Sequence, residues 1–252
     1  MIVAGMIAVI QGAYAASYYV SPAGRDSNDG LSIDTPFETP GKAQRSMQAS
    51  SIKTTIMRGG TYSIASGLKF TSKDSGESWL GYNGETVAFE GNRRGKVDID
   101  ETANFTIEGI RFQNMAAGGL HVNNVSNLAL RWNTFINSEQ NAISGYGLTN
   151  SVIDSNIIDG QHPGTISGPG STPYWAIELG IGSSNNQISH NLISKCQGGG
   201  INFGAGPEDS PNHNDHIDRN ILMNVNTDSS DSGAIYFYDP AGSARGLEIT
   251  NN

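Results

Sequence analysis

Apolar residues recur along the chain around a repeated Asn. Six segments, IEGIRF, LRWNTF, IDSNII, ISHNLI, IDRNIL and ITNN, align on one reference position. The residue three positions earlier is apolar in all six, and the residue two positions later is apolar wherever the chain continues. Stacked Asn side chains can pass hydrogen bonds from one repeat to the next, which explains a recurring Asn at a turn. The reference positions are Ile110, Asn133, Asn156, Asn191, Asn220 and Asn252.

The distances between these positions are 23, 23, 35, 29 and 32 residues. Short apolar runs separated by turns, at a minimum period of 23 residues, predict the coils of a parallel β-helix. This is an all-β fold whose coils stack about 4.8 Å apart. A leucine-rich repeat is disfavoured, because its regularly spaced Leu residues are absent.

A second strand lies between the reference positions, in GGLHV, NAISG, WAIEL, GGINF and GAIYF. The extra residues of the longer coils all fall directly before or after this strand, and insertions that gather on one face of a solenoid mark its binding face. Strand side chains alternate in direction. If the apolar residue at the centre of each of these five segments points inward, the residue after it points outward. One external column is therefore predicted: His121, Ser144, Glu178, Asn202 and Tyr236, with Gly180, Gly204 and Tyr238 two positions further on.

Carboxylates and aromatic residues surround this strand. Two carboxyl groups carry out glycosidic hydrolysis, and we expect Glu178 and Asp231 to be that catalytic pair. Aromatic rings stack on the C–H faces of sugars. The expected substrate-binding residues are Trp175, Tyr236, Tyr238, Asn202, His121 and Asp239.

Several of these residues have a plainer interpretation. Asp231 can cap a turn, and Asp239 can start one because it precedes Pro240. The inserted loops bring further polar side chains toward the same strand, among them Glu208, Asp209, His213 and Asp215.

Two other functions stay open. The first is β-elimination on a uronate polymer, with Lys195 as base or with calcium held by Asp228 and Asp231. Asp228 is the candidate metal ligand of that hypothesis. No complete calcium loop and no zinc spacing is present, so no cofactor is assigned. The second is a non-catalytic carbohydrate-binding or adhesion solenoid.

Composition limits both the possible fold classes and the possible binding partners. Only 15% of the residues are charged and 32 are Gly, which argues against both disorder and a helical bundle. The net charge of −9 and the lack of a basic patch with interleaved aromatics argue against nucleic acid. A polysaccharide or oligosaccharide is the expected partner, and the protein is expected to be a monomer. The single Cys196 excludes an intrachain disulfide and is expected to be buried.

The N-terminal residues 1–15 are typical of the later part of a secretory signal peptide. Ile2 to Ile10 form an apolar run too short to span a bilayer, and Ala13-Tyr14-Ala15 offers a cleavage site. A basic start is missing, so the signal is expected to be incomplete. We expect a secreted protein, extracellular or periplasmic, that begins at Ala16. The alternative is a buried N-terminal strand or helix.

Several stretches resemble secreted right-handed parallel β-helix proteins of the pectin lyase-like superfamily. They are YYVSPAGRDSNDGLSIDTPFETPGKAQ, IMRGGTYSI, SGESWLGYNGETVAFEG and DSGAIYFYD, together with the Asn-marked coils. The resemblance implies a right-handed single-stranded β-helix over residues 16–252, with a short N-terminal capping helix after the TPF element. Because the chain stops within a coil at EITNN, this domain is expected to be truncated at its C-terminus.

The resemblance does not specify a reaction, because the superfamily contains lyases, hydrolases, epimerases and binders. The DSGAIY stretch is similar to one in glycoside-hydrolase members, and this similarity assigns a catalytic role to Asp231. No motif matches the Lys or Arg base of pectate-type lyases or the paired aspartates of polygalacturonases.

Overall fold

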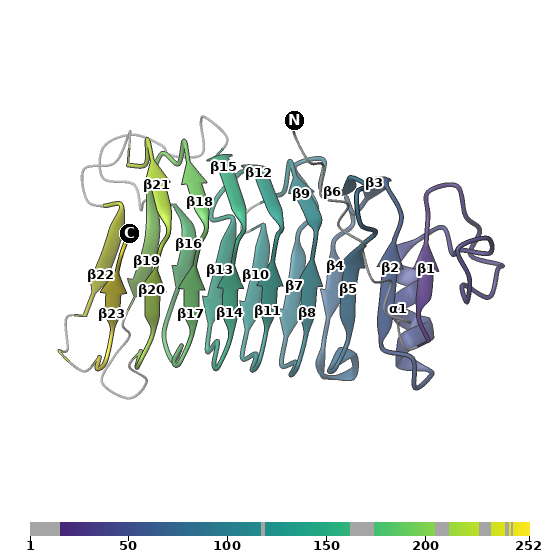
Figure 1. The fold of residues 1–252 in the computed structure, drawn as a ribbon, viewed down its shortest axis with the longest axis horizontal. Coiled ribbons are helices and arrows are strands. Elements are labelled where there is room, and N and C mark those ends of the chain that lie inside the picture. Colours follow the sequence, from purple (N-terminus) through teal and green to yellow (C-terminus); the bar gives the residue numbers. More distant parts are fainter. Residues whose placement is uncertain are drawn as a thin grey trace, which may run out of the picture.

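The computed structural model describes residues 16–116, 119–161, 174–204, 212–226, 233–239, 242 and 244–252. These residues wind into a parallel β-solenoid, which lies horizontally in Figure 1 with its N-terminal coils at the right. The predicted signal segment 1–15, Asp228, Asp231, Glu208 and Asp209 lie outside the described residues.

Three parallel sheets run along the described solenoid. Sheet A contains β1 (Tyr18–Val20), β2 (Thr54–Met57), β5 (Ser78–Gly81), β8 (Thr106–Glu108), β11 (Ala129–Arg131), β14 (Val152–Asp154), β17 (Gln187–Ser189), β20 (His216–Asp218) and β23 (Glu248–Thr250). Sheet B contains β3 (Gly60–Ser63), β6 (Val87–Glu90), β9 (Ile110–Gln113), β12 (Thr134–Ser138), β15 (Ile157–Gln161), β18 (Leu192–Ser194) and β21 (Ile221–Met223). Sheet C contains β4 (Leu68–Phe70), β7 (Val97–Asp100), β10 (Leu120–Asn123), β13 (Ile143–Tyr146), β16 (Trp175–Leu179), β19 (Gly199–Gly204) and β22 (Ile235–Tyr238).

The strands pair in the register that the repeat predicts. From β2 onward the chain passes through sheets A, B and C in turn, so each coil adds one strand to each sheet. The apolar residues three positions before each reference position pair in register on adjacent strands of sheet A. They run from Ile107 through Leu130 and Ile153 to Ile188 and Ile217. The predicted all-β parallel β-helix is therefore confirmed.

The recurring Asn forms a ladder at the corner between sheets A and B. Asn133 N donates to Asn156 Oδ1 (2.9 Å), and Asn156 N donates in turn to Asn191 Oδ1 (3.0 Å). Each amide nitrogen also donates to a carbonyl of an earlier strand, as Asn156 Nδ2 does to Leu130 O (3.0 Å). The same pattern continues through Asn220. The ladder satisfies backbone groups at the turn and fixes each coil on the next.

A second ladder, at the corner between sheets C and A, was not predicted. Ser151 N donates to Asn186 Oδ1 (3.1 Å), and Asn186 N donates to Asp215 Oδ1 (2.9 Å). Asp215 is buried, and this burial raises its pKa to about 6. The expectation that Asp215 belongs to the binding face is therefore wrong, because it occupies an Asn-like structural position. His213 lies on the same corner, where its backbone forms an isolated parallel β-bridge with Ser184.

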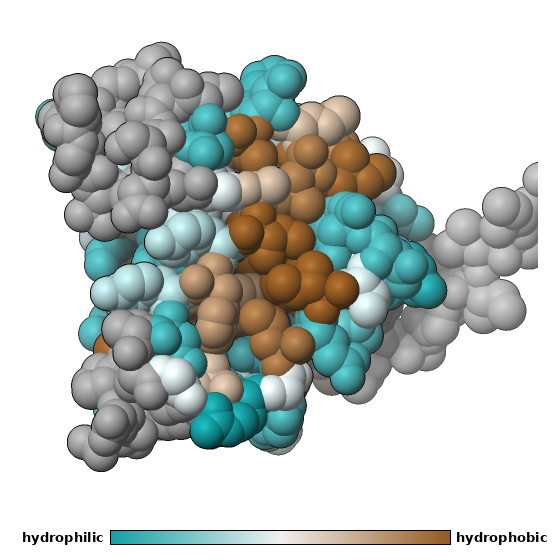
Figure 2. All heavy atoms as spheres, turned by 90° about the vertical axis from the view of Figure 1, so that its left-hand side faces the viewer, coloured by the Kyte–Doolittle hydropathy of each residue, from teal (hydrophilic) through white to brown (hydrophobic). Residues whose placement is uncertain are grey.

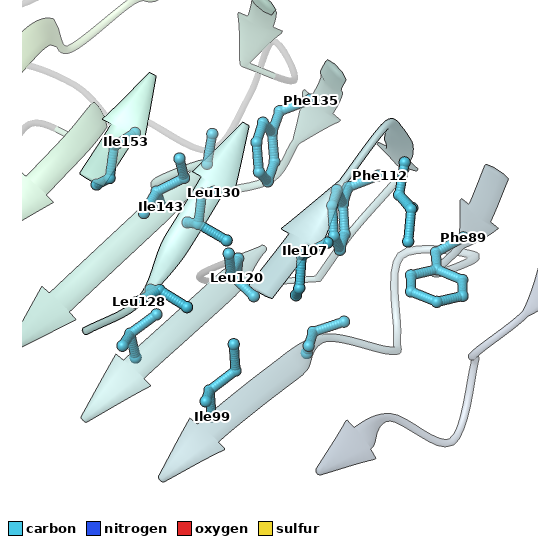
Figure 3. Close-up of a cluster of buried hydrophobic side chains, with 14 of the residues drawn as sticks. Phe89, Ile99, Ile107, Phe112, Leu120, Leu128, Leu130, Phe135, Ile143 and Ile153 are labelled. Atoms are coloured by element: carbon cyan, nitrogen blue, oxygen red, sulfur yellow. The ribbon is translucent and has the colours of Figure 1, made fainter. Parts of the chain in front are cut away.

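The core is built from columns of like residues, one column for each sheet (Figure 3). Sheet B contributes Phe89, Phe112 and Phe135, with ring centroids 5.6 and 4.8 Å apart in successive pairs. Sheets A and C contribute branched aliphatic residues to the same core. Cys196 is buried as expected, and burial raises its pKa to about 12.

The N-terminal coil is covered by the predicted short helix, α1 (Pro40–Gln48), which lies beside β1 and β2 in Figure 1. Thr39 is its N-cap and accepts a hydrogen bond from Lys42 N (3.2 Å), while Pro40 fits the first turn, where no N–H is needed. The helix buries Ala43 and Met47 against the solenoid. No helix among the described residues is long and apolar enough to cross a bilayer.

The other end of the described solenoid exposes apolar side chains, which appear as a brown area in Figure 2. Phe237 pairs by register with the buried Phe203, yet 38% of it is exposed because β22 is the last strand of its sheet. Exposed apolar residues at this end also include Ile221, Met223, Tyr238 and Ile249.

A buried carboxyl pair lies between α1 and the first coils. Glu77 and Asp74 are both fully buried. Asp74 accepts hydrogen bonds from Gln44 Nε2 (3.1 Å) and Gln48 Nε2 (2.7 Å). Glu77 Oε2 accepts from Trp79 Nε1 (3.1 Å), and its Oε1 has no hydrogen-bond partner in the described part of the chain. Burial, and secondly the nearby Asp74, raises the pKa of Glu77 to about 8.

The first prediction concerns the Asn ladder. Replacing Asn156 with Leu leaves Asn133 N buried without its partner and removes the side-chain hydrogen bond to Leu130 O, so the free energy of unfolding falls by about 1–3 kcal/mol. Denaturant unfolding measures this loss. Asn127→Gly is the control, because Asn127 is exposed, has φ +56° and makes an exposed side-chain hydrogen bond. Equal losses in the two variants would contradict the role of the ladder.

The second prediction concerns Glu77. Its pKa of about 8 in the folded state exceeds the ordinary 4.5, so between these values the folded state holds more protons than the unfolded state. The free energy of unfolding should therefore fall as the pH rises through this window, by at most about 1.4 kcal/mol per pH unit. Glu77→Gln should flatten this slope, and Glu248→Gln, on the exposed β23, should leave it unchanged. Identical slopes in wild type and Glu77→Gln would refute the assignment.

Candidate functional site

The predicted external column exists on sheet C. Register pairs His121 with Ser144, Ser144 with Glu178, Glu178 with Asn202 and Asn202 with Tyr236. The structure extends it in the N-terminal direction, where Asp98 pairs with His121 and Lys69 with Asp98. We call this set the sheet C column: Lys69, Asp98, His121, Ser144, Glu178, Asn202 and Tyr236.

Glu178 is the carboxylate at the centre of this column. It is half-buried near the end of β16, and its Oε2 accepts hydrogen bonds from Asn141 Nδ2 and Tyr146 Oη (3.3 Å). Asn141 is itself fixed, since it donates to Ser144 Oγ (3.0 Å) and accepts from Trp175 N (2.6 Å). Within the described residues no group donates to Oε1 of Glu178. One oxygen is therefore held by the protein, and the other can meet a ligand.

Tyr146 projects from the end of β13, two positions after Ser144. Burial, and secondly the charge of Glu178, raises the pKa of Tyr146 to about 12, so the phenol stays protonated and donates at neutral pH. Its ring fits because Gly180 has no side chain, since a Cβ there would lie 2.3 Å from the ring. Strand alternation from Ser144 could have identified Tyr146, whereas Asn141 precedes its strand and carries no sequence signal.

An aromatic pair lies further along the column. The rings of Trp175 and Tyr236 stack with centroids 5.4 Å apart and an interplanar angle of 27°. The Trp175 ring lies over Gly199, where a Cβ would fall 2.2 Å from it. Trp175 is only 4% exposed and is thus no open stacking surface in this structure. Its place beneath Tyr236 indicates a supporting role, whereas Tyr238 is 55% exposed.

Asn202 lies between Glu178 and Tyr236 in the column, as predicted. It is buried, and its Oδ1 has no hydrogen-bond partner among the residues that the structure describes. His121 lies two coils from Glu178 on the other side, with Nδ1 3.5 Å from Asp98 Oδ1 and its ring 6.0 Å from that of Tyr146. Asp98 also pairs with Lys96 (2.8 Å), so the charges at this end of the column compensate one another.

Other predicted residues lie elsewhere. Asp239 Oδ2 accepts from Ala244 N (2.9 Å), which is the turn geometry that its position before Pro240 suggested. Lys195 lies after β18 of sheet B, on the connection that leads to β19, and pairs with Asp159 (2.9 Å), so its role as a base stays a prediction. The chain turns out of sheet B at Lys195, which has φ +56°. In the described part of the chain, no three His, Cys, Asp or Glu side chains gather as a metal site, and the calcium hypothesis rests on Asp228 and Asp231, which lie outside it.

Comparison with known proteins identifies relatives of this fold. Residues 65–252 match the family described as the right handed beta helix region. The solved structure of the pectate lyase Pel9A is 15% identical to this chain, with a TM-score of 0.55. The match covers 81% of this chain and 54% of the Pel9A chain. The structure of XylC with xylose is 12% identical to this chain, with a TM-score of 0.57. The match covers 93% of this chain and 69% of the XylC chain.

These identities show a shared fold alone. The chain spans about half the length of the pectate lyase that it matches. A search of curated protein sequences found no match.

The third prediction tests how Glu178 is held. Gly180→Ala places a Cβ against the Tyr146 ring, so the ring should move and its hydrogen bond to Glu178 should break. Gly204 occupies the equivalent position one coil later, and a Cβ there meets nothing closer than 4.0 Å. Crystal structures of the two variants should show a displaced Tyr146 in Gly180→Ala alone. An intact Tyr146–Glu178 hydrogen bond in Gly180→Ala would contradict the prediction.

Proposed function

The chain belongs to the right-handed β-helix family, and on this basis we propose that it is a carbohydrate-active protein that binds a polysaccharide along sheet C and hydrolyses it. One observation carries the proposal. Glu178 is held through one carboxylate oxygen by Asn141 and Tyr146, while its other oxygen has no donor among the described residues. A fixed carboxyl with one accessible oxygen suits proton transfer to a glycosidic oxygen.

The surroundings of Glu178 favour a sugar. Its neighbours in the column, Ser144 and Asn202, are uncharged and buried beside it, so no charged side chain adjoins Glu178 along the column. Tyr236 and Tyr238 supply aromatic faces one and three positions after Ile235, the apolar centre of β22. Column positions about 4.8 Å apart also suit a polymer running along the solenoid axis.

Hydrolysis requires a second carboxyl group. Asp98 is three coils from Glu178, about 14 Å along the axis, and the two carboxyls of a glycosidase lie at most about 9.5 Å apart. Asp98 is thus too distant for this role. Strand β22 lies two coils from Glu178, about 9.6 Å along the axis, a spacing that favours inversion. Asp231, which precedes β22 in the sequence, remains the proposed partner.

A lyase mechanism has less support. Abstraction of a sugar C5 proton needs a base, and neutralisation of a uronate needs a cation. Strands β13, β16, β19 and β22 of sheet C carry no Lys or Arg, and Lys195 pairs with Asp159 on sheet B. The net charge of −9 further disfavours a polyanion at Glu178. We therefore propose a neutral polysaccharide as the substrate of this site.

The proposal extends to location. Ala13-Tyr14-Ala15 offers a signal-peptidase site after an apolar run, and a polysaccharide-degrading enzyme meets its polymer outside the cytoplasm. We propose that the mature chain is secreted and begins at Ala16. The names of the two structural relatives, a pectate lyase and a protein solved with xylose, also concern carbohydrates and support this class of substrate.

The fourth prediction tests hydrolysis. The protein should release reducing ends from a panel of neutral polysaccharides without ultraviolet absorbance from an unsaturated product. Glu178→Gln should lower the rate by about 10²–10⁴-fold, the range for a lost general acid or base. Glu248→Gln, an exposed Glu on sheet A, is the matched control and should keep full activity.

The other outcomes decide between functions. New ultraviolet absorbance would establish a lyase, and binding without any cleavage would establish a carbohydrate-binding solenoid. Full hydrolysis by both Glu178→Gln and Asp231→Asn would show that the assigned carboxylates are wrong.

A further inference from the structure

A tryptophan stands in an unusual place at the corner between sheets A and B. Trp132 joins β11 to β12 and has φ +53°, a left-handed conformation that residues other than Gly, Asn and Asp seldom adopt. The equivalent turn positions of the other coils are Gly109, Ser155, His190, Arg219 and Asn251. A large aromatic residue at this position is therefore not required by the coil.

The Trp132 side chain faces solvent. It is 62% exposed, whereas the other two tryptophans, Trp79 and Trp175, are 1% and 4% exposed. Among the described residues it makes no ring or cation–π contact. An exposed indole at a strained backbone position contributes nothing to the core, which points to a use at the surface.

Trp132 borders a small pocket. The pocket has a volume of about 180 Å³ and is lined also by Gly109, Arg111, Thr134 and Glu85. Gly109 precedes Trp132 by one coil at the same turn position, and its lack of a side chain leaves this part of the pocket lining without bulk. Sites for drug-sized ligands begin at about 300 Å³, so this pocket suits one small ring with the rest of a ligand outside.

The charge of the pocket is decided by Arg111. Glu85 is already neutralised, since it accepts two hydrogen bonds from Arg58 (2.8 and 2.6 Å) and one from Gly59 N (2.6 Å). This pairing holds the pKa of Glu85 low, at about 2. Arg111 pairs by backbone register with Thr134, and across the described structure its guanidinium makes no hydrogen bond or ion pair. A free guanidinium offers paired donors that match a carboxylate.

We propose that this pocket, at Trp132 and Arg111, binds an acidic sugar, a uronosyl residue whose ring stacks on Trp132 and whose carboxylate meets Arg111. Thr134 Oγ1 can hydrogen-bond a ring hydroxyl. The site lies at the corner between sheets A and B and not on sheet C, so it is separate from the proposed catalytic column and opposite to it in charge. It would anchor a glycan that carries uronate residues, whatever reaction occurs at Glu178.

The experiment measures tryptophan emission and its protection from a soluble quencher. The probes are oligogalacturonides and oligoglucuronides, each compared with the neutral galactose or glucose oligomer of the same linkage and length. A uronate oligomer should protect the exposed fraction of the emission, which comes from Trp132 because the other two tryptophans are buried. Calorimetry on the same samples gives the affinity.

Two variants separate the parts of the site. Trp132→Asn removes the ring and suits a left-handed turn, so folding should be retained or improved while affinity falls at least about tenfold. Arg111→Gln should remove the preference for uronate over neutral oligomers, again by about tenfold. Arg219→Asn is the matched control, because it introduces the same residue, Asn, at the equivalent turn position three coils away, which also has φ +53°. It should leave binding unchanged.

Several results would overturn the proposal. They are a failure of every uronate probe to protect Trp132, unchanged affinity in Trp132→Asn, equal affinity for acidic and neutral oligomers in the wild type, and binding of a protein ligand alone. Glu178→Gln should bind the uronate probe normally, so the pocket and the proposed hydrolysis can each fail independently of the other.

Discussion

The in-register stacking of one coil on the next is the constraint on which the rest of this structure depends. Backbone pairing alone lets parallel strands slip, and a slip by one residue turns every side chain to the opposite face. The Asn ladder at the corner between sheets A and B removes this freedom, because each amide is bonded to the coils before and after it. The second ladder, which ends at Asp215, does the same at another corner.

Fixed register converts a linear pattern into columns, and the columns create the sites. Glu178 meets Asn141 and Tyr146 only because β13 and β16 are aligned residue by residue. Glycine supplies the remaining room: Gly180 accommodates the ring of Tyr146, and Gly199 accommodates that of Trp175. At these points the identity of a residue in one coil is dictated by a side chain in the neighbouring coil.

The sequence was sufficient to predict the coils, the first ladder and the external column from His121 to Tyr236, because each follows from a period or an alternation, while the capping helix was expected from the family resemblance. It was insufficient where a contact depends on how a turn is built. Asp215 resembled a loop carboxylate but occupies a ladder position, and Lys195 leaves sheet B at a left-handed turn to pair with Asp159. Asn141, which orients Glu178, is the first residue of NAISG, but the other repeated segments have Gly or Trp at this position, so the repeat did not indicate its role.

The central claim is that Glu178 on sheet C acts on a glycosidic bond. The most direct measurement is a crystal structure of the Glu178→Gln protein with a bound neutral oligosaccharide. The sugar chain should run along sheet C, with one glycosidic oxygen within about 2.6–3.2 Å of the residue 178 side chain and a ring against Tyr236. An oligosaccharide bound on another face, with sheet C empty at saturating ligand, would contradict the account.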